Sequence, residues 1–182
     1  MTWKNTESRY GTVNIALHWL MLVLIAGVYA CIELKGNFPK GSEPRELLKQ
    51  WHFMLGLGVF ALVWLRLFAR FIAPTPAIQP APQGWQTTLG HLMHLALYAL
   101  MIGAPLAGWL VLSAADKPIP FFGLELPALI GKNPDLAGEI KEWHELAGTL
   151  GYWLIGLHAV AALFHHFISR DNTFTRMLPS RS

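Results

Sequence analysis

The sequence predicts an all-α integral membrane protein, built as a bundle of four transmembrane helices. Hydrophobic residues make up 53% of the 182 positions and charged residues only 14%, which is unusual for a water-soluble domain of this length. Crossing a bilayer takes about 20 apolar residues. Four stretches contain no Asp, Glu, Lys or Arg: 15–32, 50–65, 89–115 and 146–169. Since none alternates strictly between apolar and polar residues, the strands of an outer-membrane barrel are not expected.

The first helix is expected over about residues 13–33. Lys4 and Arg9 precede it, as they would precede the core of a signal peptide. However, the apolar run is longer than such a core and carries His18 near its start, so we expect a helix of the mature protein. Cys31 is the only cysteine, which excludes an internal disulfide and a cysteine-ligated cluster.

The second helix, about residues 47–72, opens with Trp51-His52. Its charge-free core is short, but the helix can continue past Arg66, because an arginine can keep its aliphatic part in the membrane while its guanidinium reaches the interface. His52 is then expected at the opposite membrane depth from His18.

The third helix, about residues 88–113, follows a proline-rich linker that favours an extended conformation. His91 and His94 lie near its start, and their roles are open. The fourth helix is expected over about residues 142–169. The whole chain, 1–182, is thus predicted to form one integral-membrane domain.

The net charge of +3 is distributed around the ends of the predicted helices. The two membrane sides of the predicted bundle have equal numbers of Lys and Arg. On the side of the termini these residues lie closer to the helix ends and are accompanied by fewer Asp and Glu residues. This distribution favours both termini in the cytoplasm. Because the basic residues flank the spans instead of forming one patch, nucleic-acid binding is not expected.

The fourth helix carries four of the eight histidines, and three of them share a face. His144 and His158 are nearly four turns apart, so their rings point within about 40° of each other and lie about 21 Å apart along the axis. Gly148 and Gly151 lie near the face between them, and His165 follows two turns later. One histidine in an apolar helix is usually a satisfied interior residue, but several on one face favour a functional site.

Membrane depth sorts four of the histidines into two pairs. His52 and His144 open their helices on the outer side, whereas His18 and His158 lie in the inner halves of theirs. Two imidazoles from different helices are what a six-coordinate haem iron requires, and without a CxxCH motif the haem would be b-type. We therefore predict two b haems. The alternatives are a methionine as one axial ligand, and zinc or non-haem iron bound by histidines and the carboxylates that flank His144.

These residues resemble those of a known family, the bacterial cytochrome b561 proteins, which are four-helix, di-haem, quinone-linked cytochromes of the inner membrane. The resemblance covers nearly the whole chain and rests on motifs in every predicted helix and in the tail: Tyr10-Gly11, Ala16-Leu17-His18-Trp19, Trp51-His52, Gly90-His91 with His94, Trp143-His144, His158, His165-His166-Phe167, Asp171-Asn172-Thr173 and Arg176-Met177. It implies that the four paired histidines are the haem ligands: His18, His52, His144 and His158. It also implies a ubiquinone site at His165.

Within this family, the segment from Tyr29 to Lys40 is similar to the superoxide oxidase branch. The similarity implies that superoxide gives electrons to the outer haem at the periplasmic face, and that the inner haem passes them to ubiquinone. Four nearby cations are available to attract the anion: Lys35, Lys40, Arg45 and Lys49. Two alternatives stay open. One is a cytochrome b subunit that passes electrons between a hydrogenase or dehydrogenase partner and quinone, and the other is a non-catalytic membrane protein that only binds haem.

Overall fold

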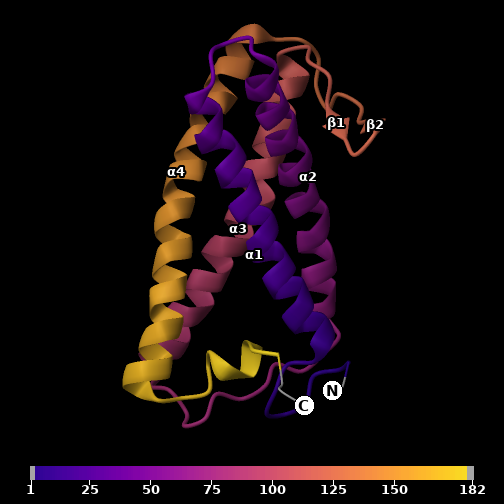
Figure 1. Cartoon of the computed structure of the whole chain (residues 1–182). Coiled ribbons are helices and arrows are strands. Elements are labelled where there is room, and N and C mark those ends of the chain that lie inside the picture. The colour runs from indigo at the N-terminus through magenta and orange to yellow at the C-terminus, as the bar shows by residue number, and fades with distance from the viewer. Residues whose placement is uncertain (1–2, 180–182) are drawn as a thin grey trace. The chain divides into compact units, whose positions relative to one another are not determined.

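Four long helices dominate the structure, a computed structural model that describes residues 3–179 (Figure 1). They are α1 (Thr12–Leu34), α2 (Glu43–Phe71), α3 (Gly84–Ala114) and α4 (Pro134–Phe164). Each is long and apolar enough to cross a membrane, and at most 28% of the positions in any span are buried. The predicted all-α fold with four transmembrane helices is confirmed.

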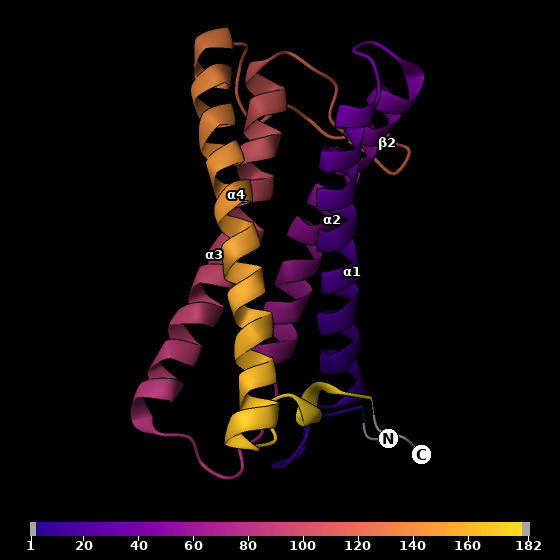
Figure 2. The ribbon, with the colours of Figure 1, turned by 60° about the vertical axis from the view of Figure 1, so that its left-hand side comes forward.

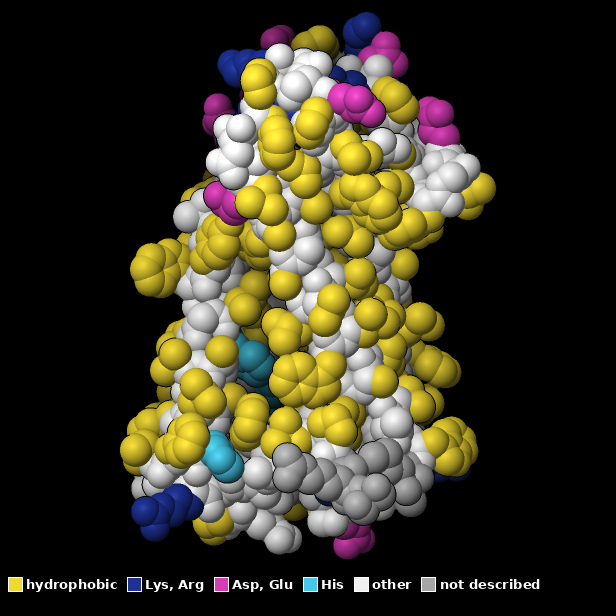
Figure 3. Space-filling model, in the orientation of Figure 1, with side chains coloured by type: hydrophobic (Ala, Val, Ile, Leu, Met, Phe, Trp, Pro, Cys, Tyr) yellow, Lys and Arg dark blue, Asp and Glu magenta, His cyan; other side chains and the backbone are white. Residues whose placement is uncertain are grey.

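The helix surfaces are apolar where a soluble protein would be polar. Val23, Phe68 and Trp153 are 66%, 65% and 76% exposed. In Figure 3 hydrophobic side chains cover the helix surfaces, while most charged side chains gather toward the helix ends. Because exposure of so much apolar surface to water is unfavourable, these surfaces are suited to lipid.

Three of the helices begin earlier than the predicted residues 47, 88 and 142. At the start of α4, Asn133 Oδ1 accepts the Leu136 N–H at 3.1 Å, and Pro134 occupies the first helical position. At the start of α3, Gln86 reaches back so that its side-chain oxygen accepts the Gln83 N–H at 2.9 Å. Such polar first turns lie outside an apolar run, so hydropathy alone places the helix starts too late.

A π-helical turn, His165–Ser169, ends the fourth span. Beyond it the chain turns back as a tail that includes a short 3₁₀ helix, Thr175–Met177. The Trp19 indole donates to the Met177 carbonyl at 2.9 Å. The tail, yellow in Figure 2, therefore lies beside the first turns of α1.

The chain divides into two compact units, and each contains part of every long helix. The first unit comprises the N-terminal residues up to Trp19, Trp64–Leu100, and the residues from Thr149 onward. The second comprises Leu20–Val63 and Met101–Gly148. The first unit thus holds His18, His94, His158 and His165, and the second holds His52 and His144. That the chain works as a single domain stays a prediction.

The second unit has a small core covered by a hairpin. Strands β1 (Pro120–Phe121) and β2 (Leu124–Glu125) pair antiparallel. Phe122 and Gly123 form the turn between them, with φ angles of 47° and 87°, the left-handed region that a tight two-residue turn requires. The buried core consists of Leu57, Leu112 and Ile119. Phe53, the neighbour of His52, packs against that core, which supports α2 beside His52.

Candidate haem sites

In the second unit, His52 of α2 and His144 of α4 face each other, with ring centroids 6.1 Å apart and ring planes at 90°. Nδ1 of His52 lies 3.0 Å from the Val28 carbonyl, and Nδ1 of His144 lies 2.9 Å from the Ala104 carbonyl. Because a carbonyl oxygen only accepts, each Nδ1 must carry the ring hydrogen. Both Nε2 atoms therefore keep a free lone pair, the tautomer that a metal ligand needs.

The α3 backbone lies close to the His144 ring. A Cβ built at Gly108 would lie 3.3 Å from His144 Cε1 and 3.6 Å from Nδ1. Gly108 is one turn after Ala104, so both residues are on the same face of α3. The glycine leaves room for the ring, and the alanine carbonyl fixes its tautomer. In α4, a Cβ at Gly148 would meet nothing within 4 Å, so there is open space one turn after His144.

In the first unit, His18 of α1 and His158 of α4 have ring centroids 6.4 Å apart and ring planes at 72°. A third ring, His94 of α3, lies 5.7 Å from that of His158. The Arg66 guanidinium of α2 donates to His18 Nδ1 at 2.9 Å. His18 thus accepts a hydrogen bond from a cation, whereas the histidines of the second unit donate to carbonyls. Iron binding at Nε2 of His18 would displace the ring proton there, and Arg66 is close enough to balance the resulting charge.

The ring separations can be compared with the geometry of axial haem ligands. With a metal–nitrogen bond of about 2 Å and about 1.2 Å from that nitrogen to the ring centre, two imidazoles that bind one iron from opposite sides would have centroids about 6.4 Å apart. The two pairs, at 6.1 and 6.4 Å, fit this value. Among the described residues, no three His, Cys, Asp or Glu side chains form a group that could hold a metal ion. The geometry therefore favours haem over the zinc or non-haem iron alternative.

His165 is paired with a carboxylate. Its Nδ1 lies 2.5 Å from Asp171 Oδ2, and only 3% of the Asp171 side chain is exposed. Burial raises the pKa of the Asp171 carboxyl, but hydrogen bonds from His165 and Thr173 together lower it by more than burial raises it. The net pKa of Asp171 is therefore below its usual value. Asp171 therefore stays ionised at neutral pH.

The cations expected to attract superoxide lie in the second unit. Arg45 donates to the Lys35 and Phe38 carbonyls, and Lys49 pairs with Glu46 at 2.7 Å. A hollow of about 290 Å³ is lined by Lys49, Glu46, Phe53 and Lys117, among others. Because Glu46 balances Lys49, the excess positive charge of this hollow comes from Lys117, a residue of the loop between α3 and β1.

Three residues beside the histidines were not predicted as parts of the sites: Arg66, Gly108 and Asp171. An arginine inside an apolar helix is costly and is usually functional, so Arg66 was recognisable as a candidate. Asp171 follows His165 closely in the sequence, but the turn that brings the two side chains together was not apparent.

Paired imidazoles carried by apolar spanning helices define a class: helical membrane proteins that hold haem through histidine. The model of a family described as prokaryotic cytochrome b561 matches residues 9–180. The chain is 38% identical to cytochrome b561 homolog 1 of Escherichia coli strain K12, over 96% of this chain and 99% of that protein. It is 36% identical to the probable superoxide oxidase CybB of Yersinia pestis, over 96% of this chain and 98% of that protein. It is 32% identical to cytochrome b561 homolog 2 of E. coli strain K12, over 100% of this chain and 97% of that protein.

The chain therefore belongs to the prokaryotic cytochrome b561 family, as predicted. It is a multi-pass bacterial membrane protein of electron transfer, and the family implies haem b.

Proposed function

We propose that this protein oxidises superoxide at the periplasmic face of the inner membrane and reduces ubiquinone at the cytoplasmic face, with both termini in the cytoplasm. Two superoxide anions each lose one electron and become O₂, and ubiquinone takes up those two electrons and two protons to become ubiquinol. The observation that carries the proposal is the presence of two imidazole pairs, each at the ring separation of two axial haem ligands. The similarity to a probable superoxide oxidase favours superoxide as the donor.

The four paired histidines, His18, His52, His144 and His158, would hold one haem b per pair. Haem b bound there would supply one-electron transfer. The residues around the outer pair keep it rigid, because each ring is fixed at Nδ1 by a carbonyl of a neighbouring helix. Because both rings of a pair would be held as ligands, superoxide would not have to bind the metal.

The outer cations would attract the anion. Lys117 and Lys49 line the hollow beside Phe53, the residue that follows His52. A local positive potential raises the encounter rate of a small anion, and salt weakens that effect.

His165 would bind the quinone. It follows His158 by seven residues, so it lies on about the same helix face and about 10.5 Å further along the axis. Since Asp171 occupies its Nδ1, the Nε2 atom of His165 is the one available to a quinone carbonyl. An imidazole can both donate that hydrogen bond and transfer the proton near neutral pH.

The test is a stopped-flow measurement on the purified, haem-loaded protein with enzymatically generated superoxide and a short-chain ubiquinone. We expect haem reduction by superoxide and formation of ubiquinol, with two haems per chain by pyridine haemochrome analysis. A protein that superoxide does not reduce would refute the proposal. Copurification with a dehydrogenase that does reduce it would favour the cytochrome b subunit instead.

A further inference from the structure

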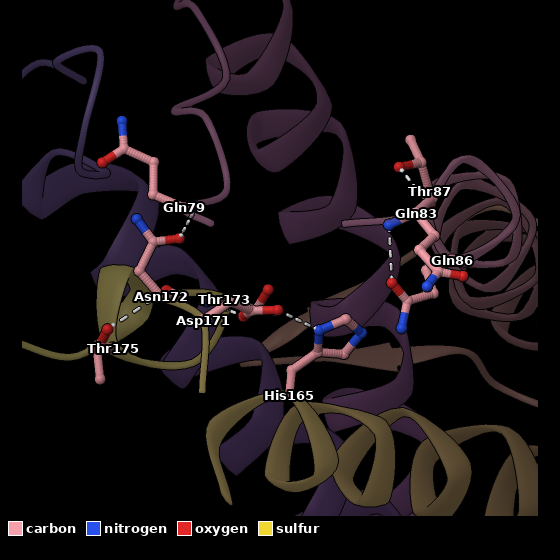
Figure 4. A network of polar contacts seen from close by, with 9 residues as sticks. All are labelled: Gln79, Gln83, Gln86, Thr87, His165, Asp171, Asn172, Thr173 and Thr175. Atoms are coloured by element: carbon pink, nitrogen blue, oxygen red, sulfur yellow. Dashed lines mark hydrogen bonds and ion pairs between the residues drawn. The ribbon is translucent and has the colours of Figure 1, made fainter. Parts of the chain in front are cut away.

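The carboxylate beside His165 is unusual for its surroundings. Among the described residues, the buried polar or charged side chains are Ser113 and Asp171. Burying a carboxylate is costly unless it is paired. Figure 4 shows the Asp171 side chain pointing at His165, whose own side chain is 19% exposed. The pair thus has a buried acidic member and a basic member that is open to a ligand.

The backbone at the end of α4 brings the two side chains together. Arg170 has φ 54°, in the left-handed region, so the chain reverses directly after the π-helical turn. The N–H groups of Arg170 and Asp171 both donate to the His165 carbonyl, the latter at 3.1 Å. His165 is therefore held twice by the same turn, once through its carbonyl and once through its imidazole. Left-handed non-glycine residues of this kind often occur at functional sites.

The negative charge of Asp171 is not needed to anchor the tail. Its second oxygen, Oδ1, accepts the Thr173 N–H at 2.8 Å, a contact that a neutral amide could also make. The tail is fixed to the proline-rich linker by the next residue. The Asn172 N–H donates to the Gln79 carbonyl at 3.0 Å, and the Gln79 N–H donates to Asn172 Oδ1 at 2.8 Å (Figure 4).

The negative charge of Asp171 would assist proton transfer from His165 to a quinone. To give a proton from Nε2 while Nδ1–H is bonded to Asp171, the imidazole must first hold two protons and a positive charge. The adjacent carboxylate balances that charge. After the proton has moved to the quinone oxygen, the Nδ1–H bond to Asp171 remains, so the ring keeps its orientation and Nε2 can take up the next proton.

We infer that Asp171 is a positioning residue of the ubiquinone site, which orients His165 and balances its charge during each of the two proton transfers that accompany the two electrons. This inference rests on the proposed function, since it requires His165 to contact the quinone.

The test is Asp171→Asn in the full-length, haem-loaded protein. Asparagine keeps the size and the acceptor for Thr173 but removes the charge. We expect both haem spectra and the rate of reduction by superoxide to be unchanged. The kcat for ubiquinone reduction should fall about tenfold, because a charge-assisted hydrogen bond is about twice as strong as a neutral one. The KM for the quinone should change little, and Asp171→Glu should restore much of the rate.

Two further variants separate positioning from tail anchoring. Asn172→Ala removes the side-chain bond, in which Asn172 Oδ1 accepts the Gln79 N–H, without touching His165, and it should keep near wild-type kcat. The double variant His165→Ala with Asp171→Asn should be no slower than His165→Ala alone, because a residue that acts only through His165 has nothing left to act on.

The outcomes are distinct. Wild-type kcat in Asp171→Asn, loss of a haem in that variant, or an equal defect in Asn172→Ala would each overturn the inference. If His165→Ala reduces quinone normally, the proposed quinone site itself is wrong. If His165→Ala is slow and Asp171→Asn is not, only the role of Asp171 is rejected.

Discussion

Enlarging Gly108 should disturb the outer haem site without unfolding the protein. A Cβ at this position would lie 3.3 Å from His144 Cε1, so the ring must yield by a few tenths of an ångström in Gly108→Ala. Overpacking costs about 1–3 kcal/mol, and replacing glycine by alanine within a helix returns about 1 kcal/mol. The free energy of folding should therefore change little.

As a proposed haem ligand, His144 tolerates less displacement than the fold does. Metal–ligand distances hold to about ±0.2 Å, and His144 cannot move freely because its Nδ1 is bonded to the Ala104 carbonyl at 2.9 Å. Disturbing such supporting groups typically lowers metal affinity about 10–100-fold. We expect Gly108→Ala to weaken the outer haem. In Gly108→Leu the further carbon atoms would enter the space of the ring, and the outer haem should be lost.

The assay is haem per chain by pyridine haemochrome, combined with a redox titration that resolves the two components. Gly103→Leu is the matched control. Gly103 is also in α3, but a Cβ built there would meet nothing within 4 Å. Two intact haem components in Gly108→Leu would refute the argument that Gly108 makes room for His144.

Three other predictions concern the same sites. His52→Ala and His144→Ala should remove one spectral component, and His18→Ala and His158→Ala the other; a component shared by His52→Ala and His158→Ala would contradict this pairing. His94→Ala should keep both haems by haemochrome analysis, and loss of the inner one would mean that His94, not His18, is the partner of His158. Arg66→Gln should lower the midpoint potential of the inner haem by about 60 mV, since one nearby charge at an effective dielectric constant of about 20 contributes about 1–2 kcal/mol. An unchanged potential in a redox titration would show that Arg66 does not act on that haem.

The spans could be predicted from the sequence because a membrane helix needs a long run without charges, and four such runs exist. The starts of α2, α3 and α4 could not be predicted in this way. The first turns of α2 and α4 contain charged residues such as Glu43 and Asp135, which hydropathy assigns to loops. The caps that place those turns in helices are local polar contacts, such as that of Asn133 with the Leu136 N–H.

The histidine pairs were predictable for a similar reason. His144 and His158 share a face through helical periodicity alone, and membrane depth then indicates their partners. Contacts that depend on how one helix is rotated against another cannot be read from periodicity or from membrane depth. Arg66 was expected to reach the interface, yet its guanidinium donates to His18, a residue 48 positions away. Gly108 likewise gives no sign in the sequence that it faces His144.

The hydrogen bonds at Nδ1 also give the two pairs different electrostatic surroundings. In the outer pair each Nδ1–H donates to a carbonyl, which makes the imidazole more electron-rich and favours the oxidised metal. In the inner pair a guanidinium lies 2.9 Å from His18 Nδ1, and a neighbouring cation favours the state with one more electron. This effect is opposed by the negative charge that His18 would acquire if Nε2 lost its proton to bind iron, because Arg66 would then balance that charge. Under the proposed function the electron would move from the outer to the inner pair, and a redox titration of Arg66→Gln measures how far this cation assists that transfer.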